Sequence, residues 1–366
     1  MKYKELRGKV QNWQKWPGTV KLERAPLIHE GFPGNFNLSF AEYNWLKEFE
    51  GFTNIDHTFH FSSIQSCIRF NDFSNLDTVA AWKYLGVFDM ADVTGMLAFD
   101  NKMDPAKIQE FNIRGLVEFL SSMGLDKKRM HPKYCAGGNV GDLTGGKYTF
   151  DFDVPEDLIS KNNFLRIGIP EQNLIPDKTR DTLLALNCYG RPFPWGYRNE
   201  IEYNIGDDDN KKNFVDIGTV EYLPWAPIFK DKIISGLEET NCGSAVTAVG
   251  LERIAMVSDG LKRIQDVDHI KPVYDAANES NNEFTIENIR ALHRIYSDIK
   301  HYGCEVGRHR RDKINIMIRN IPIIYSSDKI KDLLEVHSEN QPWHPEMKDG
   351  IETTIEAIEK YRKNVK

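Results

Sequence analysis

The sequence contains no run of apolar residues long enough to cross a bilayer, for which about 20 would be needed. Its first ten residues, MKYKELRGKV, are hydrophilic and lack both the apolar stretch and the small-residue cleavage site of a secretory signal. With 40% hydrophobic and 28% charged residues, the composition is ordinary for a globular protein. We therefore expect a cytoplasmic protein without a membrane-bound part.

Paired cysteines are also missing. The five cysteines lie far apart, without a CxxC pair or a metal-ligand spacing: Cys67, Cys135, Cys188, Cys242 and Cys304. An odd number at such spacings favours reduced thiols over a disulfide framework. A zinc site would require cysteines and histidines that converge only in the fold, and this alternative stays open.

The chain has no excess of positive charge, because 47 Lys and Arg residues are outnumbered by 54 Asp and Glu residues and the formal net charge is -7. Affinity for nucleic-acid phosphates depends on a local excess of cations. The charge balance therefore argues against DNA binding, and contact with tRNA would need a local basic patch. Internal repeats and low-complexity tracts are absent as well, and nothing in the sequence indicates an oligomeric state.

A length of 366 residues allows two domains, because one domain usually contains about 100 to 200 residues. The composition changes at 271–284, KPVYDAANESNNEF, in a way that is typical of a linker. We expect a catalytic domain over 1–265, a linker over 266–284 and a helical domain over 285–366.

Several segments of the larger domain have the pattern of strands. The runs at 57–70 and 84–90 predict an antiparallel hairpin. KYTFDFDV at 147–154 alternates apolar and polar residues and predicts a half-buried strand, and the run at 213–225 predicts a strand that ends at Pro224.

Two helices are expected in the same domain. One begins at Asp104-Pro105 and ends at Gly124, and another follows Gly250 and ends at Gly260. The first fifty residues show no clear period and are interpreted as an irregular lead-in. Beyond the linker, apolar stripes at 286–299 and 351–365 predict amphipathic helices.

Three segments carry residues suited to chemistry. Arg69 lies among apolar and small residues, and Arg253 enters a helix directly after Gly250. A buried guanidinium needs a partner, so a structural ion pair is the alternative for both arginines. Four carboxylates lie on two neighbouring predicted strands and are either solvated or suited to Mg²⁺: Glu200, Glu202, Asp216 and Glu221.

The order of these segments resembles the catalytic core of class II aminoacyl-tRNA synthetases, specifically the alanyl type. The family's second motif has a Cys-Ile-Arg triplet, an Asn-Asp-Leu-Glu-Asn-Val stretch and a Phe-Glu-Met strand. Their counterparts are Cys67-Ile68-Arg69, NDFSNL at 71–76 and Phe88-Asp89-Met90. GLERIA at 250–255 matches the third motif.

Further segments extend the resemblance over about residues 57 to 320. The run at 168–186 is similar to the family's segment before its amino-acid pocket, and those at 199–206 and 214–222 resemble two of its strands. The helices after the linker are more loosely similar. The resemblance implies an α+β fold with an antiparallel sheet flanked by helices and followed by a smaller helical domain.

The resemblance also implies an ATP-dependent ligase that activates a carboxylate as an acyl-adenylate. Arg69 would bind the α-phosphate and the attacking carboxylate, and Arg253 would bind the γ-phosphate end. Mg²⁺ would bind Asp216 and Glu200. The other residues assigned to ATP binding are Phe88, for the adenine ring, Asp89 and Gly250.

The predicted substrate pocket departs from the family. Val246 stands where alanyl enzymes have an aspartate that binds the substrate ammonium, Thr219 replaces an asparagine, and Leu184 replaces a tryptophan. A buried ammonium without its carboxylate is costly. The substrate therefore either places an amine against another carboxylate, such as Glu221 or Glu239, or has no amine, and Leu184 leaves room for a larger acid.

The acceptor is in question too. The family's lysine-bearing insert after the motif-two arginine is reduced to Phe70, and neither an editing domain nor a C-terminal extension is expected. A basic cluster after the linker is either a tRNA-binding patch or a solvated face: Arg308, Arg310, Arg311 and Lys313. Our leading hypothesis is activation of an amino acid or related carboxylic acid and its transfer to an amine, a peptide or a carrier thiol. The alternatives are a minimal alanine-tRNA ligase and a catalytically silent regulatory or tRNA-binding paralogue.

Overall fold

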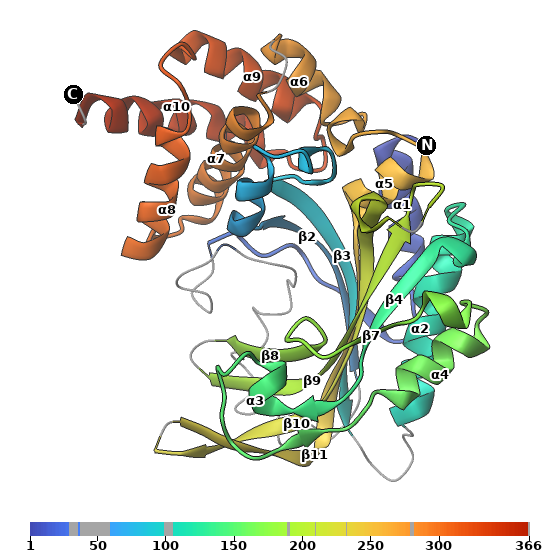
Figure 1. Ribbon diagram of the computed structural model, residues 1–366. Helices are drawn as coiled ribbons and strands as arrows, with labels where there is room; N and C mark the ends of the chain where they lie inside the picture. The colour runs from blue at the N-terminus through green and yellow to red at the C-terminus, as the bar shows by residue number, and fades with distance from the viewer. Residues whose placement is uncertain are drawn as a thin grey trace.

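The computed structural model describes residues 1–28, 36, 59–98, 105–188, 191–208, 210–231, 233–278 and 282–364 (Figure 1). A curved sheet of nine strands forms its centre: β1 (Thr19–Lys21), β2 (Phe59–Ile68), β3 (Val87–Ala98), β4 (Met130–Cys135), β7 (Ile175–Asp177), β8 (Leu183–Cys188), β9 (Arg191–Asn204), β10 (Phe214–Lys230) and β11 (Ile233–Gly250). The strand order is β1-β2-β3-β11-β10-β9-β4-β7, and β8 also pairs with β9. Only β1 with β2 and β4 with β7 pair in parallel among these described strands. The predicted α+β class with an antiparallel sheet is confirmed.

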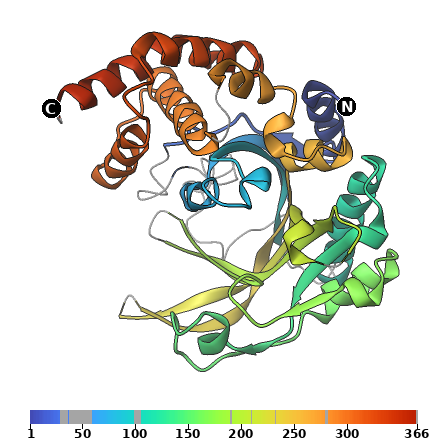
Figure 2. The ribbon, with the colours of Figure 1, turned by 45° about the horizontal axis from the view of Figure 1, so that its top comes forward.

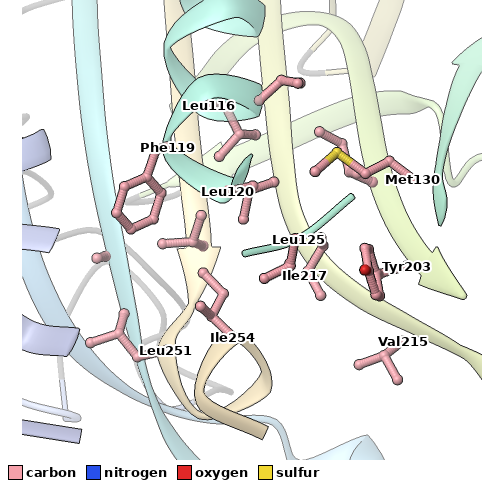
Figure 3. Packing of buried hydrophobic residues seen from close by; sticks show 14 of the residues in the cluster. Leu116, Phe119, Leu120, Leu125, Met130, Tyr203, Val215, Ile217, Leu251 and Ile254 are labelled. Atoms are coloured by element: carbon pink, nitrogen blue, oxygen red, sulfur yellow. The ribbon is translucent and has the colours of Figure 1, made fainter. Parts of the chain in front are cut away.

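Helices cover one face of this sheet. They are α1 (Tyr3–Trp13), α2 (Pro105–Ser122), α4 (Leu158–Arg166) and α5 (Leu251–Ser258). Leu116 and Leu120 of α2 share a buried cluster with Ile217 of β10 (Figure 3). Burial of one such aliphatic side chain contributes about 1.5 to 3 kcal/mol, so this cluster fixes the sheet against its helices.

The predicted boundaries of two helices are confirmed. Helix α2 begins at Pro105, whose missing amide proton costs nothing in the first turn, and the chain leaves it at Gly124, where φ is +87°. Helix α5 begins directly after Gly250, and Gly260 follows it with φ of +62°. Asp104, the expected cap of α2, lies outside the described residues.

The interpretation of the N-terminal fifty residues as an irregular lead-in is wrong for their first part. Helix α1 presents Tyr3, Leu6 and Val10 to the core, and all three side chains are fully buried. Their spacing of three and four residues is that of one helix face. Most of 29–58 lies outside the described residues.

The strand predicted at 147–154 is also wrong. Only Asp153 and Val154 form a strand, β6 (Asp153–Val154), which pairs with β5 (Gly138–Asn139) beside the short helix α3 (Val140–Leu143). The aromatic side chains that produced the alternation do pack, since Tyr148 lies edge-on to Trp195 with ring centroids 4.6 Å apart. Side-chain alternation here reflects aromatic packing of an irregular segment.

Strand β10 continues beyond Pro224 to Lys230, so the predicted end of this strand is wrong. The register of β10 shifts around Pro224 on both sides, between Leu223 and Trp225 against β11 and between Tyr222 and Trp225 against β9. Proline is tolerated within a sheet at such a bulge because the local ladder hydrogen bond is already interrupted.

The predicted hairpin is confirmed as the antiparallel pair β2 and β3. Its connection contains two 3-10 turns, 70–75 and 81–83. At Gly86, a Cβ atom would lie 2.4 Å from the Phe73 ring, so this position requires glycine. The connection is thus a packed element rather than an open loop.

The C-terminal helices gather at one end of the sheet (Figures 1 and 2). They are α6 (Lys271–Ala277), α7 (Glu283–Tyr302), α8 (Arg308–Arg319), α9 (Ser327–Glu339) and α10 (Glu346–Asn364). Both predicted amphipathic helices are confirmed, as α7 and α10, while Val365 lies outside the described residues. The segment interpreted as a linker contains α6, with Val273 and Ala277 buried, so it is not an extended connection. Among the described residues, no helix is long and apolar enough to cross a membrane.

Candidate functional site

The register of the central strands places most of the predicted site residues on the sheet face that α2 does not cover. Directly opposite residues in antiparallel strands share a face, as do alternate residues along a strand. Two rows of directly opposite residues result: Ala248, Thr219 and Glu200, then Val246, Glu221 and Arg198. Val220, between Thr219 and Glu221, points into the hydrophobic core instead.

Arg69 follows directly after β2 and lies over Phe88 of β3, with its Cζ atom 5.4 Å from the ring centroid. This is the range of a cation-π interaction. Within the described part of the chain, no carboxylate lies within ion-pair distance of Arg69. The structural ion pair considered as an alternative for this arginine is therefore not found there.

Arg253 projects from the first turn of α5. Its Nη1 lies 2.8 Å from Oδ2 of Asp216, and its Cζ lies 6.0 Å from the ring centroid of Tyr84. The alternative of a structural ion pair is thus realised for this arginine. Gly250 is the N-cap of α5 and borders Met90, with the ordinary space that a Cβ atom would need.

Asp72 is a member of this site that the sequence did not single out. Burial raises the pKa of its carboxyl, and the positive charges of Arg253 and Arg69 act against that rise. Among the described residues, its buried Oδ2 atom has no hydrogen-bond partner. Asp72 therefore lies in the field of both arginines, and its place in the NDFSNL segment is the signal that could have identified it.

Two lysines add positive charge at the same face and were also missed. Lys133 of β4 lies 3.0 Å from Oε1 of Glu202 and 3.9 Å from Oε2 of Glu200. Lys83 donates a hydrogen bond of 2.8 Å to the carbonyl of Phe214, and burial lowers the pKa of its ammonium. The carboxylates of β9 and β10 are thus partly neutralised by cations from other elements.

The two predicted metal ligands, Asp216 and Glu200, interact electrostatically. Burial, and then the negative charge of Asp216, raise the pKa of Glu200, while Arg198 and Lys133 oppose the rise. In the described ranges, no group of three or more ligating side chains forms. Two carboxylates still fit Mg²⁺ when nucleotide phosphates supply the other ligands, which is the usual way in which proteins bind this ion.

Asp89 is separated from the other residues predicted to bind ATP. It is adjacent to Phe88 in β3, so the two side chains point to opposite faces of the strand. Its carboxylate accepts hydrogen bonds from Tyr3 at 3.2 Å and from Ser66 at 2.9 Å, and pairs with Arg7. Although burial opposes it, His344 and Arg7 hold the pKa of Asp89 well below its usual range. The structure thus places Asp89 in a buried network behind the site.

This network reaches the C-terminal helices through Ser66. The Ser66 hydroxyl donates to Asp89 and accepts from Arg294 of α7 at 3.2 Å. Arg294 also donates to Glu346 of α10 at 3.0 Å. Asp89 and Glu252 share the interior of the network, where burial and the charge of Asp89 raise the pKa of Glu252 to about 8.

The four residues of the predicted substrate pocket come together in register. Leu184 of β8 is opposite Gly196 and is half-buried, on the same face as Arg198. Glu221 is 5% exposed, and burial raises the pKa of its carboxyl to about 7, with Arg198 opposing and Glu200 and Asp92 supporting the rise. Val246 is 4% exposed and directly faces Glu221. Glu239, by contrast, is exposed and opposite Trp225, further along the β10–β11 hairpin.

The predicted basic patch is smaller than the sequence indicated. Arg308 and Arg311 of α8 are exposed, but Arg310 is only 4% exposed and burial lowers its pKa, so its inclusion in the patch was wrong. Lys313 lies over the Phe70 ring, 5.3 Å from its centroid. Beside it, a groove of about 500 Å³ is lined by residues of the motif-two segment and of α7 and α8: Phe70, Asn71, Phe73, Ser74, Phe284, Asn288, Ile316 and Asn320.

Comparison with known sequences finds alanine-tRNA ligases. The ligase of Renibacterium salmoninarum is 28% identical over 124 residues, covering 31% of this chain and 14% of that protein. The ligase of Rhizorhabdus wittichii is 27% identical over 143 residues, covering 36% and 15%. The ligase of Rubrobacter xylanophilus is 24% identical over 233 residues, covering 60% and 23%. This chain therefore spans less than a quarter of the length of these curated relatives, and no family model matches it.

Solved structures with a similar arrangement include apo histidyl-tRNA synthetase from S. aureus. Its TM-score is 0.41 at 11% identity, over 73% of this chain and 68% of that one. Pyrrolysyl-tRNA synthetase from Desulfitobacterium hafniense has a TM-score of 0.33 at 12% identity, over 73% and 72%. Scores this low add nothing to the sequence relationship.

The motif segments lie on neighbouring strands and on the helix that follows them, in the order in which the alanyl family has them. The sequence relatives carry the name of that same family. The chain therefore has a class II aminoacyl-tRNA synthetase-like core that is related to that of alanine-tRNA ligases.

Proposed function

We propose that this chain uses ATP to activate an amino acid or a related carboxylic acid as an acyl-adenylate. It then transfers the acyl group to a nucleophile other than alanine tRNA, namely an amine, a peptide or a carrier thiol. The observation that carries the proposal is the position of Arg69, without a carboxylate partner in the described chain, on the same site as Arg253.

The first step places a specific demand on the site. A carboxylate oxygen attacks the α-phosphorus of ATP, the bond from that phosphorus to the bridging oxygen breaks, and pyrophosphate leaves with the bonding electrons. Negative charge increases on the phosphoryl oxygens and on the leaving group, and fixed cations stabilise it. The residues of this site have to supply those cations without being neutralised by their own neighbours.

Arg69 fits the centre of that reaction. A guanidinium donates two parallel hydrogen bonds, which matches a phosphate or a carboxylate better than an ammonium does. Because Phe88 holds Arg69 through its ring and not through a carboxylate, the hydrogen-bond donors of Arg69 stay available for substrate. The Phe88 ring is half-buried, and we assign it to the adenine side of the site.

Arg253 fits the leaving-group end, with Gly250 at the start of the helix that carries it. Its present partner, Asp216, would exchange that arginine for Mg²⁺ when nucleotide binds, and Glu200 would be the second carboxylate. The ion would neutralise charge on the phosphates. Lys133 pairs with Glu202, and Lys83 interacts electrostatically with the same carboxylate, so the remaining negative charge of the face is partly balanced.

The competing function is alanine-tRNA ligation, and a specific observation favours it: the three sequence relatives are alanine-tRNA ligases. Against it stand Val246 at the position where the family binds the substrate ammonium, and a basic patch from which Arg310 is withdrawn. A catalytically silent paralogue is disfavoured, because such a protein has no use for an arginine kept without a counter-ion.

Pyrophosphate exchange against a panel of amino acids and amine-free carboxylic acids tests the proposal. We expect exchange that depends on ATP, Mg²⁺ and one class of acid. Exchange that is strongest with alanine, together with charging of alanine tRNA, would replace the proposal by the competing function. Absence of exchange with every acid would favour the silent paralogue.

A further inference from the structure

Two polar atoms are buried without a partner in the centre of the β10 strand. Glu221 is 5% exposed, and its Oε2 atom has no hydrogen-bond partner among the described residues. Thr219, two residues earlier on the same face, has a buried hydroxyl that also lacks one. Buried polar groups in proteins are nearly always hydrogen-bonded, because leaving one unsatisfied costs about 1 to 3 kcal/mol. Two such atoms on the same strand face leave hydrogen-bonding capacity that a ligand group would satisfy.

The charges around Glu221 define what that ligand group is. On β9, Arg198 is directly opposite and Glu200 is next on the same face, and on β3 the buried Asp92 adds to the negative field. Arg198 offsets Glu221 only in part, because its Nε donates to the Asp181 carbonyl at 2.8 Å and its Nη2 lies 3.6 Å from Glu200. Lys133 lies 3.0 Å from Glu202 and 3.9 Å from Glu200 at the same face. The four carboxylates of Glu221, Glu200, Glu202 and Asp92 still outnumber these two cations, which favours a cationic ligand group.

The residue that faces Glu221 from β11 is apolar. Val246 of β11 is directly opposite Glu221, and on its other side it is paired with Thr94 of β3. Directly opposite Cα atoms in such a pair are about 5 Å apart. The position that carries a carboxylate in the related core is therefore one strand away from the buried carboxylate that this chain has. In this chain, the buried carboxylate beside this position is on β10.

We propose that Glu221 and Thr219 bind a protonated amino group of the acid that this chain activates. The substrate class is thus carboxylic acids that carry an ammonium group, held from β10 and not from β11. An ammonium donates three hydrogen bonds, and Glu221 and Thr219 accept two of them. This inference rests on the proposed function, since it concerns the acid bound at the same site.

The ionisation of Glu221 predicts that the affinity for an ammonium group depends on pH. The Glu221 carboxyl has a pKa of about 7, because burial and the negative charges of Glu200 and Asp92 raise the pKa more than the positive charge of Arg198 lowers it. Only the ionised form attracts an ammonium, so affinity for an amine-bearing acid should increase as the pH rises from 6 to 8. Acids without an amine should show no such increase.

Direct binding of matched acids tests this inference without requiring catalysis. Calorimetry would measure α-, β- and γ-amino acids beside the same acids without the amine, from pH 6 to pH 8. For the wild type, we expect amine-bearing acids to bind at least tenfold more tightly at pH 8. Glu221→Gln should abolish that preference and its pH dependence, and Thr219→Val should reduce it about threefold.

Glu238→Gln is the matched control, because it removes the same charge from the exposed part of the neighbouring strand and should leave binding unchanged. If Glu221→Gln does not fold, the expected loss of the preference for amine-bearing acids in Thr219→Val tests the inference instead. An equal or tighter affinity for amine-free acids in the wild type, or no binding of any acid in the panel, would overturn the inference.

Pyrophosphate exchange with the same acids separates this inference from the proposed function. Amine-dependent binding without pyrophosphate exchange would support ammonium binding by Glu221 and Thr219 and would contradict the proposed adenylation. Pyrophosphate exchange that is driven by amine-free acids would support the proposed adenylation and would contradict ammonium binding by Glu221 and Thr219.

Discussion

Arg253 and Asp216 form an ion pair of 2.8 Å, although each is also suited to a partner on ATP. The arginine cannot bind a phosphate with the same donor, nor the aspartate hold Mg²⁺ with the same oxygen, while the pair is closed. If the chain binds nucleotide as proposed, this one interaction would be replaced by two. Arg69 contacts the Phe88 ring and pairs with no carboxylate among the described residues, so it would need no such exchange.

The two arginines should therefore both be essential for activation. Arg69→Ala and Arg253→Ala are each expected to abolish acid-dependent pyrophosphate exchange, a loss on the order of 3 kcal/mol or more of transition-state stabilisation. Arg114→Ala is a suitable control, because Arg114 lies exposed on α2 at the other face of the sheet. Wild-type exchange rates in both site variants would show that the motif assignment is wrong.

Free alanine should be a poor substrate, because Val246 offers no hydrogen bond to an ammonium placed as in the related ligases. Comparison of kcat/KM for alanine and for larger or differently substituted acids measures this. Val246→Asp should increase kcat/KM for alanine if the rest of the pocket is family-like. Alanine as the best wild-type substrate by a wide margin would contradict the prediction.

Alanine tRNA should not accept the activated acyl group. The motif-two connection is short, and of the four residues of the basic cluster Arg308 and Arg311 are exposed. Each phosphate contact needs a local cation, so weak and salt-sensitive binding is the most that this surface supports. After the adenylate has formed with the preferred acid, total tRNA is added and an alkali-labile ester is sought. Stoichiometric charging would make this chain a compact aminoacyl-tRNA ligase.

Asp89→Asn should destabilise the fold without acting through nucleotide binding. It leaves Arg7 and His344 beside a neutral amide, and loss of one member of a buried ion pair costs about 3 to 5 kcal/mol. Urea unfolding at pH 7 measures the difference, with exposed Asp151→Asn as the control.

The pH dependence of unfolding checks the same network. Because the pKa of Asp89 is lowered in the folded state, its contribution is present above the unfolded pKa of about 3.9 and is lost as the pH falls through the folded value. The difference between wild type and Asp89→Asn should therefore shrink in acid. A difference that is constant down to pH 2 would contradict this.

Part of the site could be predicted from the sequence because motif residues sit next to sharp local signals. Arg69 ends a strand and Arg253 begins a helix at Gly250, so both positions follow from local pattern. The separation of Asp89 from Phe88 could also have been predicted, since consecutive residues of a strand point to opposite faces. Arg310 could also have been assigned to the core, because Ile314, Met317 and Ile318 follow at helical spacing on the buried side of α8.

Other features depend on contacts that no local pattern contains. Glu221 lies directly opposite Val246 because of the register between the long strands β10 and β11. Bulges shift this register, so it cannot be predicted from local sequence. Lys83 and Lys133 reach the site from separate elements. Helix α1 was missed because its apolar stripe is short. It consists of Tyr3, Leu6, Val10 and the partly buried Trp13, and their burial is decided by the core that they join.

The hydrogen bonds that Ser66 makes to Asp89 and to Arg294 connect the strand carrying Phe88 with the C-terminal helices. Charged groups on both sides of this contact would be left without partners in a low-dielectric interior if the helices were cut away. A truncation after α5 would thus yield an insoluble fragment rather than a smaller enzyme. Heat should melt the sheet and the helices in a single calorimetric transition.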